Sequence, residues 1–148
     1  MQILQGQCRK QSRKVLESDF ERIKKLSGEM IDLCRTKLGR YPMAHAIAHC
    51  QVDHNDPLRF FVTYDGMVII NPKIVKRDSE TITIIEACYS FANREGKNIK
   101  RYAKIYVDYQ FMKKKGDVVQ RRDQLFEDTK ARVVQHELDH FQGKSIYS

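Results

Sequence analysis

Hydrophobic residues recur at helical spacing in two stretches, one near each end of the chain. The first stretch covers residues 18–38, and its apolar positions are Phe20, Ile23, Met30, Cys34 and Leu38. Ser18 and Glu21 have the spacing of a capping box, and Gly39 follows as a stop signal. The pattern therefore predicts a helix over residues 18–38 with one buried side.

The second stretch covers residues 125–142 and places imidazole and carboxyl groups on its apolar side. The residues on that side are Leu125, Thr129, Val133, His136, Glu137 and His140. Gly143 is typical of the residue that follows the end of a helix. We therefore predict a second helix over residues 125–142, with two histidines and a glutamate on its buried side.

Between these helices, alternation and β-branched runs indicate strands. The predicted strands cover residues 58–64, 67–72, 81–88 and 103–112, with a short one near 118–120. Asp65-Gly66 is a strong hairpin signal between the first two strands, and residues 81–88 (TITIIEAC) are expected to be buried. Residues 103–112 alternate, with Ile105, Val107, Tyr109 and Phe111 on one face. Residues 41–57 are interpreted mainly as loop.

The expected fold class is α+β: a mostly antiparallel sheet with an N-terminal helix and a C-terminal helix. A chain of 148 residues suggests a single domain over residues 1–148. No apolar run approaches the roughly 20 residues of a membrane span, and the N-terminus lacks the apolar region of a secretory signal. The four cysteines are widely spaced without a C-x-x-C pair, which favours free thiols in a reducing cytosol.

The net charge of +8 has two interpretations. Basic clusters occur at Lys24-Lys25, residues 97–104, residues 113–115 and Arg121-Arg122. Such clusters can contact RNA or another polyanion, or they can form a solvated surface. We favour the solvated surface, because no RNA-binding signature accompanies the charge.

The second helix carries candidate metal chemistry. His136, Glu137 and His140 form the sequence H-E-x-x-H, which places two imidazoles one turn apart where both can hold one metal. The glutamate between them is the usual base that activates water. Catalytic sites normally have three protein ligands, and the longer metallopeptidase pattern fails at Ile146, where it requires histidine. The third ligand must therefore lie upstream.

Several upstream residues can supply that ligand. The candidates are Cys8, Cys34, Cys50, Cys88, His45, His49 and His54. Cys88 is favoured, because it ends an apolar strand expected beside the last helix and because a thiolate binds first-row metals strongly. The alternative for Cys88 is an inert buried thiol. His45, His49, Cys50 and His54 could also form a separate site of their own.

Three segments of the chain resemble the motifs of the peptide deformylase family. The third family motif, Q-H-E-x-D-H-L-x-G, is matched by residues 135–143 with phenylalanine in place of leucine, and the second, E-G-C-L-S, by residues 86–90, EACYS. The first motif, G-x-G-x-A-A-x-Q, is matched loosely by residues 44–51, AHAIAHCQ. Ala44, Ala46 and Ala87 stand where the family has glycine, which adds methyl groups where the substrate is expected to lie.

The resemblance implies a specific chemistry. It implies that Cys88, His136 and His140 hold one divalent metal, natively Fe(II) with Ni, Co or Zn as substitutes. It also implies that Glu137 is the general base and acid, and that Gln51 and the Tyr89 backbone N–H stabilise the oxyanion while formyl-methionine loses its formyl group. The substrate-binding residues that it suggests are Ala44, His45, Ala46, Ile84, Glu86, Ala87, Thr129, Arg132 and Val133.

The resemblance also suggests a minimal, C-terminally short form like those carried by phages. Its expected substrates are N-formylmethionyl peptides in a bacterial or phage-infected cytoplasm, and its expected state is a monomer. Contact with the ribosome through the basic surface is a further expectation, whereas a membrane or DNA partner is not expected. Two other functions stay open from the residues alone: a zinc endopeptidase, and a non-enzymatic basic module that binds RNA or the ribosome.

Overall fold

The computed structural model describes residues 1–37, 45–91 and 93–148, and its α+β architecture confirms the predicted fold class. The two long helices are α1 (Phe20–Lys37) and α2 (Asp128–Phe141). The strands are β1 (Ala46–Ala48), β2 (Phe60–Thr63), β3 (Val68–Arg77), β4 (Thr81–Glu86), β5 (Lys97–Tyr102), β6 (Lys104–Met112) and β7 (Val118–Glu127). Short 3-10 helices are η1 (Glu17–Asp19), η2 (His49–Gln51) and η3 (Tyr89–Phe91).

The first helix lies close to its predicted bounds and buries the predicted side. Three of its apolar residues are fully buried: Ile23, Met30 and Cys34. The predicted capping box is not what begins the helix. Ser18 lies inside η1, where the Asp19 carboxylate accepts a hydrogen bond from the Leu16 N–H at 2.8 Å. The predicted helix end at residue 38 and the stop at Gly39 lie outside the described residues.

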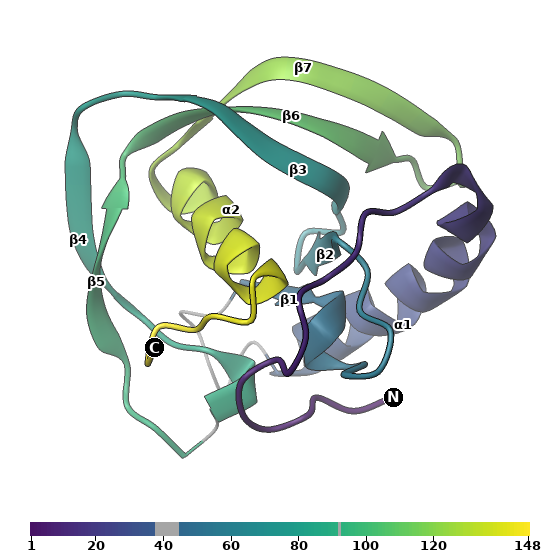
Figure 1. Cartoon of the computed structure of the whole chain (residues 1–148), viewed down its shortest axis with the longest axis horizontal. Helices are drawn as coiled ribbons and strands as arrows, with labels where there is room; N and C mark the ends of the chain where they lie inside the picture. Colours follow the sequence, from purple (N-terminus) through teal and green to yellow (C-terminus); the bar gives the residue numbers. More distant parts are fainter. Residues whose placement is uncertain (38–44, 92) are drawn as a thin grey trace.

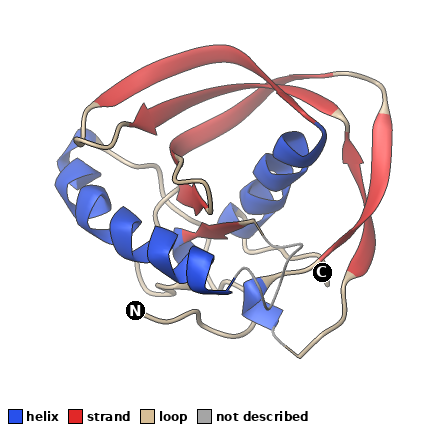
Figure 2. Ribbon diagram, turned by 180° about the vertical axis from the view of Figure 1, so that it is seen from behind, coloured by secondary structure: helices blue, strands red, loops and turns tan. Residues whose placement is uncertain are grey.

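Five strands form one antiparallel sheet in the order β1-β2-β3-β6-β7, with a helix on each face. The predicted hairpin at Asp65-Gly66 joins β2 to β3, and Gly66 has a φ of +92°, which favours glycine. Alternate residues of β2 pack into different cores: Phe61 with α2 residues, Phe60 with α1 residues. The middle of the sheet is therefore covered on both faces (Figures 1 and 2).

The sheet continues around α2 as a long bent hairpin. β3 continues into β4, and β5 returns into β6, so the β4-β5 ribbon prolongs the β3-β6 pair. Two main-chain hydrogen bonds cross the bend, from the Asp78 N–H to the Lys104 carbonyl at 3.1 Å and from the Ala103 N–H to the Glu80 carbonyl at 3.0 Å. In Figure 1 the hairpin curves around α2.

The β4-β5 ribbon differs from the sequence prediction in two ways. The prediction of a buried strand over residues 81–88 is wrong. β4 ends at Glu86, and residues 81–85 alternate between exposed and half-buried, with Ile85 49% exposed; only Glu86 is fully buried. A two-stranded ribbon leaves much of its surface open to solvent, so a β-branched run indicated a strand without indicating burial. The second difference is β5, which lies within a basic cluster and was not predicted.

The boundary between β7 and α2 also differs. β7 extends to Glu127, far past the short strand predicted near residues 118–120, and α2 begins at Asp128 rather than at 125. Leu125 pairs with Tyr106 in the sheet and is 46% exposed, so it is not on the buried side of the helix. Apolar residues keep a helical spacing across the junction of β7 and α2, so the sequence pattern did not show where the strand ends and the helix begins. Similarly, β1 and η2 occur within the predicted loop.

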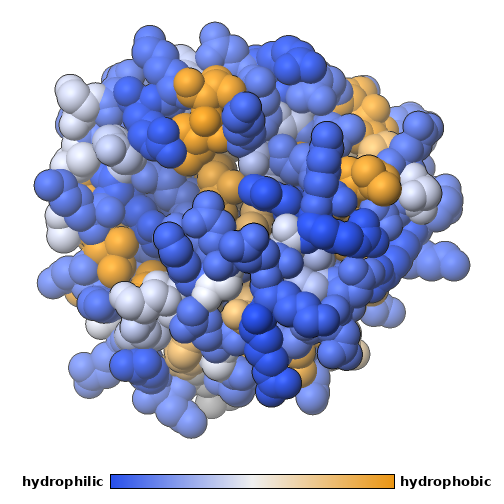
Figure 3. All heavy atoms as spheres, in the orientation of Figure 1, coloured by the Kyte–Doolittle hydropathy of each residue, from blue (hydrophilic) through white to orange (hydrophobic). Residues whose placement is uncertain are grey.

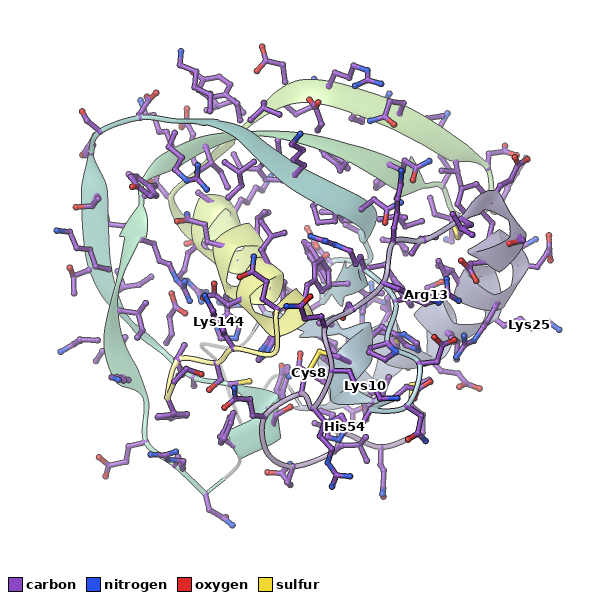
Figure 4. The ribbon with its side chains drawn as sticks, viewed as in Figure 1. Cys8, Lys10, Arg13, Lys25, His54 and Lys144 are labelled. Carbon is purple, nitrogen blue, oxygen red and sulfur yellow. A yellow bond between two sulfur atoms is a disulfide. The ribbon has the colours of Figure 1, made fainter. Side chains whose placement is uncertain are left out.

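A disulfide joins Cys8 to Cys50, which corrects the prediction that all the cysteines are free thiols. The two Cα atoms lie 5.8 Å apart although 42 positions separate the residues in sequence, so spacing alone could not reveal the pair. Figure 4 labels Cys8 at this point of the N-terminal segment. The Leu4 N–H also donates to the Gln51 carbonyl at 2.8 Å and helps to hold the segment. The two free cysteines are Cys34 and Cys88, and both are buried.

The surface is mainly hydrophilic on the side that Figure 3 shows, with hydrophobic residues in small separate patches. Within the described parts of the chain, no helix is long and apolar enough to cross a membrane.

Candidate metal centre

The second helix brings His136 and His140 together as the sequence predicted. They lie on the same side of α2, one turn apart, with 3.1 Å between their Nε2 atoms. Both residues are buried. The two imidazole nitrogens therefore point into one enclosed space, where they can bind the same ion.

Cys88 completes the group from a different part of the fold. It lies two residues after β4, and its Sγ is 3.4 Å from His140 Nε2. The potential ligand atoms of Cys88, His136 and His140 all lie within 4.8 Å of one another. One thiolate and two imidazoles suit a divalent metal and leave a coordination position open. Across the described residues this is the one such group of three, and His45, His49 and His54 do not form a second.

A buried ion pair supports one of the imidazoles from behind. His136 Nδ1 is 2.8 Å from Glu86 Oε1, and Arg101 donates to both Glu86 oxygens at 2.9 and 3.0 Å. Burial alone would raise the pKa of Glu86, but the hydrogen bonds from His136 and Arg101 lower it to about 2. A carboxylate that stays ionised in this position fixes the ring and directs Nε2 toward the metal group.

Arg101 is a residue that the sequence interpretation missed. Its side chain is 10% exposed, and it also donates to Asp139 Oδ2 at 2.7 Å, so it links β5 to both β4 and α2. It belongs to the basic cluster of residues 97–104, which was interpreted as a solvated surface. Lys100, the preceding residue, is exposed. Successive side chains of a strand point to opposite faces, so recognising β5 as a strand would have predicted that Lys100 and Arg101 lie on opposite faces.

Gln51 approaches the metal group from η2. Its Nε2 lies 3.5 Å from Cys88 Sγ and 3.0 Å from Ser90 Oγ. The Ala48 N–H donates to Gln51 Oε1 at 2.8 Å and so fixes which end of the amide faces the sulfur. The side chain is thus held as a donor beside the candidate ligands. Ser90 was not among the predicted site residues, although it belongs to the EACYS segment.

Glu137 lines the same cavity as Cys88 and His136, and one of its two carboxylate oxygens has no partner among the described residues. The residue is 2% exposed, and among the described residues its Oε2 has no hydrogen-bond partner. Burial raises the pKa of the Glu137 carboxyl to about 7, although His136 and Arg132 act in the opposite direction. A carboxyl group that changes protonation near neutral pH and has a free oxygen can exchange a proton with a small molecule.

The comparison with known families agrees with this geometry. The sequence model described as Polypeptide deformylase matches residues 2–148. The chain belongs to the polypeptide deformylase family. A peptide deformylase of Pseudothermotoga lettingae is 39% identical over 88 residues, which is 58% of this chain and 48% of that protein. One of Rickettsia typhi is 25% identical over 138 residues, which is 93% of this chain and 73% of that protein. The chain thus spans about half the length of the first of these relatives.

Solved structures of the family have the same fold. The peptide deformylase of Thermotoga maritima superposes with a TM-score of 0.76 at 33% identity, covering 95% of this chain and 88% of that one. A probable peptide deformylase from Synechococcus phage S-SSM7 gives a TM-score of 0.78 at 24% identity, covering 99% and 97%. The phage structure supports the fold alone.

The residues suggested to bind substrate divide into three groups around the metal group. His45, Ala46, Ala87, Arg132 and Val133 line a narrow cavity together with Cys88, Tyr89, His136 and Glu137. Thr129 is exposed and lines an adjoining cavity. Glu86 lies behind His136 instead, Ile84 is half-buried on β4 and lines neither cavity, and Ala44 falls outside the described residues. Two of the alanines that replace family glycines therefore do face the site.

Proposed function

We propose that this chain is a metal-dependent deformylase that hydrolyses the formyl group from N-terminal formyl-methionine of new proteins and releases formate. One observation carries the proposal: the buried Glu137, which has an oxygen without a partner among the described residues, lines the same cavity as Cys88 and His136. The ligand atoms of Cys88, His136 and His140 lie within 4.8 Å of one another. Metal-assisted hydrolysis of an amide requires a set of metal ligands with a general base beside it. Membership of the deformylase family supports the choice of a formyl amide.

The reaction follows from the residues present. Cys88, His136 and His140 would hold a divalent metal, which when bound supplies a Lewis acid and lowers the pKa of a water molecule. Glu137 accepts a proton from the attacking water and delivers it to the leaving amine nitrogen, which its pKa of about 7 permits. A C–O bond to the formyl carbon forms and the C–N bond breaks, so the products are formate and a free N-terminal amine.

The oxyanion that develops on the formyl oxygen needs fixed donors. We assign this role to the Gln51 side-chain amide and the Tyr89 backbone N–H. The hydrogen bond from the Ala48 N–H to Gln51 Oε1 at 2.8 Å supports the assignment, because it holds the amide nitrogen toward the Cys88 side. Donors held in place before reaction stabilise the transition state without the cost of reorganising.

The native metal is proposed to be Fe(II), with Ni, Co or Zn able to replace it. The thiolate and imidazole donors suit all four ions, and the ligand set by itself suits zinc equally well. Elemental analysis of protein isolated without added metal, under anaerobic conditions, distinguishes them. Iron as the main metal supports the proposal, and a full complement of zinc contradicts it.

We further propose one catalytic domain over residues 1–148 that acts as a monomer in the cytoplasm and contacts the ribosome through its basic surface. A groove of about 870 Å³ between α2 and strands β3, β6 and β7 supports the ribosome contact. Its cationic lining residues are Lys14, Arg59, Lys73, Arg77, Arg101 and Arg122. We expect the protein to bind ribosomes with an affinity that falls steeply as the salt concentration is raised.

The deciding experiment measures formate release from a formyl-Met tripeptide. The protein is reconstituted anaerobically with Fe(II), or with Ni(II) as an air-stable substitute. Turnover is expected in the wild type and should fall on the order of a thousandfold in Glu137→Gln, which retains its metal. Cleavage of an unformylated peptide would favour a zinc endopeptidase instead, and salt-sensitive RNA binding without turnover would favour a binding module.

A further inference from the structure

The N-terminal segment, residues 4–12, connects the two pieces of chain that carry the proposed oxyanion donors. The Leu4 N–H donates to the Gln51 carbonyl at 2.8 Å. The Gly6 N–H donates to the Ser90 carbonyl at 2.7 Å. Gln51 and Ser90 are 39 positions apart in sequence, and they lie on η2 and η3. One short segment therefore helps to fix the position of η2 relative to η3.

The same segment contacts the residue whose backbone N–H is the second proposed donor. Gln5 Nε2 donates to the Tyr89 carbonyl at 3.1 Å. Farther along the segment, the Ser12 N–H donates to the Phe141 carbonyl at 2.8 Å, at the end of the helix that carries the histidines. The segment thus contacts both donor-bearing pieces near its start and α2 near its end.

One covalent bond holds this segment in place. The disulfide joins Cys8 to Cys50, which directly precedes Gln51 in the chain. Cys50 Sγ also lies 3.6 Å from the backbone carbonyl oxygen of His140. Residues 4–8 belong to no helix or strand, and a single hydrogen bond contributes only about 1 kcal/mol to stability. A segment with so few contacts opens readily unless it is cross-linked, so the disulfide is what keeps it against the donors.

We propose that the N-terminal segment positions Gln51 and Tyr89 for hydrolysis, and that the Cys8–Cys50 disulfide makes the rate depend on the thiol redox state. The inference rests on the proposed deformylase function. A dithiol opens the bond by exchange. Its thiolate attacks the sulfur of Cys8, which is flanked by exposed residues, and Cys50 leaves as a thiolate that takes up a proton. The second thiol of the reagent then displaces Cys8, so the protein gains two thiols and the reagent becomes a cyclic disulfide.

The test compares oxidised and reduced wild type in formate release from a formyl-Met tripeptide. Both samples are loaded with Ni(II), the reduced one is treated with dithiothreitol and desalted under nitrogen, and rates are expressed per bound metal. We expect kcat to fall about tenfold on reduction while KM changes less than about twofold, because the donors act on the transition state. Cys8→Ser should show the low kcat in both conditions. The control Cys34→Ala leaves the disulfide intact and should respond to reduction as the wild type does.

A second comparison separates positioning from a merely structural role. Gln51→Ala already lacks one donor, so reduction should lower its kcat by less than about threefold. An equal fall in Gln51→Ala and in the wild type would mean that the disulfide acts only through general stability, and it would overturn the inference. A wild-type kcat that does not change on reduction would overturn it as well, and would leave the deformylase function intact.

Amide hydrogen exchange keeps the inference separate from the proposed function. Exchange at residues 49–51 and 89–91 should be at least about tenfold faster after reduction, because the segment that holds them is released. If neither redox state releases formate, the deformylase function is refuted, and unchanged exchange at these residues would still overturn the inference. Should Cys8→Ser fail to fold, Leu4→Pro removes the N–H that donates to Gln51 and keeps the disulfide. It should lower kcat severalfold in the oxidised protein.

Discussion

At the scale of single residues, the two free cysteines show how surroundings decide chemistry. Cys34 and Cys88 are both buried. Cys34 lies on the buried side of α1, where burial raises the pKa of its thiol to about 11 and keeps it protonated. Cys88 instead has an imidazole nitrogen 3.4 Å from its sulfur. Only the second environment can stabilise a thiolate bound to a metal.

This contrast gives a paired prediction. Cys88→Ala should lose nearly all bound metal and formate release, because two imidazoles alone hold a divalent ion weakly. Cys34→Ala removes the same atoms from the other core and should retain one metal per chain. Elemental analysis of both purified variants measures the difference. Full metal occupancy in Cys88→Ala would move the third ligand elsewhere.

His49 illustrates a buried histidine with a structural role. It stands where the first family motif has alanine, and its Nδ1 accepts a hydrogen bond from the Leu58 N–H at 2.9 Å. Its ring stacks on Phe60 with centroids 5.0 Å apart. Burial lowers the pKa of His49 to about 4, although Asp53 acts in the opposite direction. The neutral ring is therefore the form that the folded protein accommodates.

The stability of the fold should depend on this histidine at mildly acidic pH. In the unfolded chain its pKa is about 6.5, so its stabilising contribution is complete above that value and is lost as the pH falls toward 4. The loss amounts to on the order of 3 kcal/mol. His49→Asn keeps a hydrogen-bond acceptor that does not titrate. Denaturant unfolding between pH 7 and 4 should show a shallower decline for the variant, and equal slopes would contradict this assignment.

At the scale of elements, one arginine locks the bent hairpin to the helix that carries the histidines. Arg101 on β5 pairs with Glu86 at the end of β4 and with Asp139 on α2. Gln135 adds a second connection, since its side chain both donates to and accepts from the Tyr102 backbone at 2.9 and 3.0 Å. The geometry of the metal group therefore depends on contacts between elements as well as on the ligands.

Arg101→Met should weaken both the fold and the metal site. It leaves the buried Glu86 carboxylate without its guanidinium and with only His136 as a partner, which should lower the free energy of unfolding by about 3–5 kcal/mol. Metal affinity should fall about 10–100-fold, because His136 loses its oriented partner. Lys100→Met changes the exposed neighbour on β5 and is the control. Chelator competition and thermal unfolding measure the two effects, and wild-type metal affinity in Arg101→Met would refute the link.

The parts of this site that could be predicted are those whose signals are local. His136 and His140 are four residues apart on one helix, so their spacing alone brings them together. Cys88 could be inferred because it closely follows a recognisable strand and lies in a motif. Arg101 could not, since its partner is 15 positions away and its strand was hidden in a basic cluster. The start of α2 was predicted wrongly for a similar reason. Leu125 belongs to the sheet because β7 pairs with β6, and this contact between distant residues leaves no local signal in the sequence.

At the scale of the whole molecule, the N-terminal segment fastens separate parts of the chain together. Besides the Cys8–Cys50 disulfide, the Ser12 N–H donates to the Phe141 carbonyl at 2.8 Å. The segment thus spans from the end of α2 to the residue next to Gln51. Its attachment constrains the unfolded chain strongly, because the disulfide closes a loop between residues 42 positions apart.

Opening this disulfide should lower stability without removing the metal ligands. A loop of this size corresponds to about 4 kcal/mol of stabilisation, or on the order of 10 °C in Tm for a chain of this length. Cys8→Ser should show the loss with and without reductant, whereas the wild type should show it only after reduction. Thiol titration of the unfolded wild type should find two reactive cysteines before reduction and four afterwards. Four before reduction would exclude the disulfide.

The disulfide has a practical consequence for any preparation of this protein. Cys88 must remain reduced to bind a metal, whereas Cys8 and Cys50 must be oxidised to join. Excess dithiothreitol therefore keeps Cys88 reduced but also opens the disulfide and releases the N-terminal segment. Air keeps the disulfide closed but exposes Cys88 to oxidation. Preparations that differ only in their buffer would then contain two different molecules, one with Cys88 reduced and the N-terminal segment released, the other with the segment attached and Cys88 exposed to oxidation. The redox potential of the buffer should be fixed and stated with every rate measured.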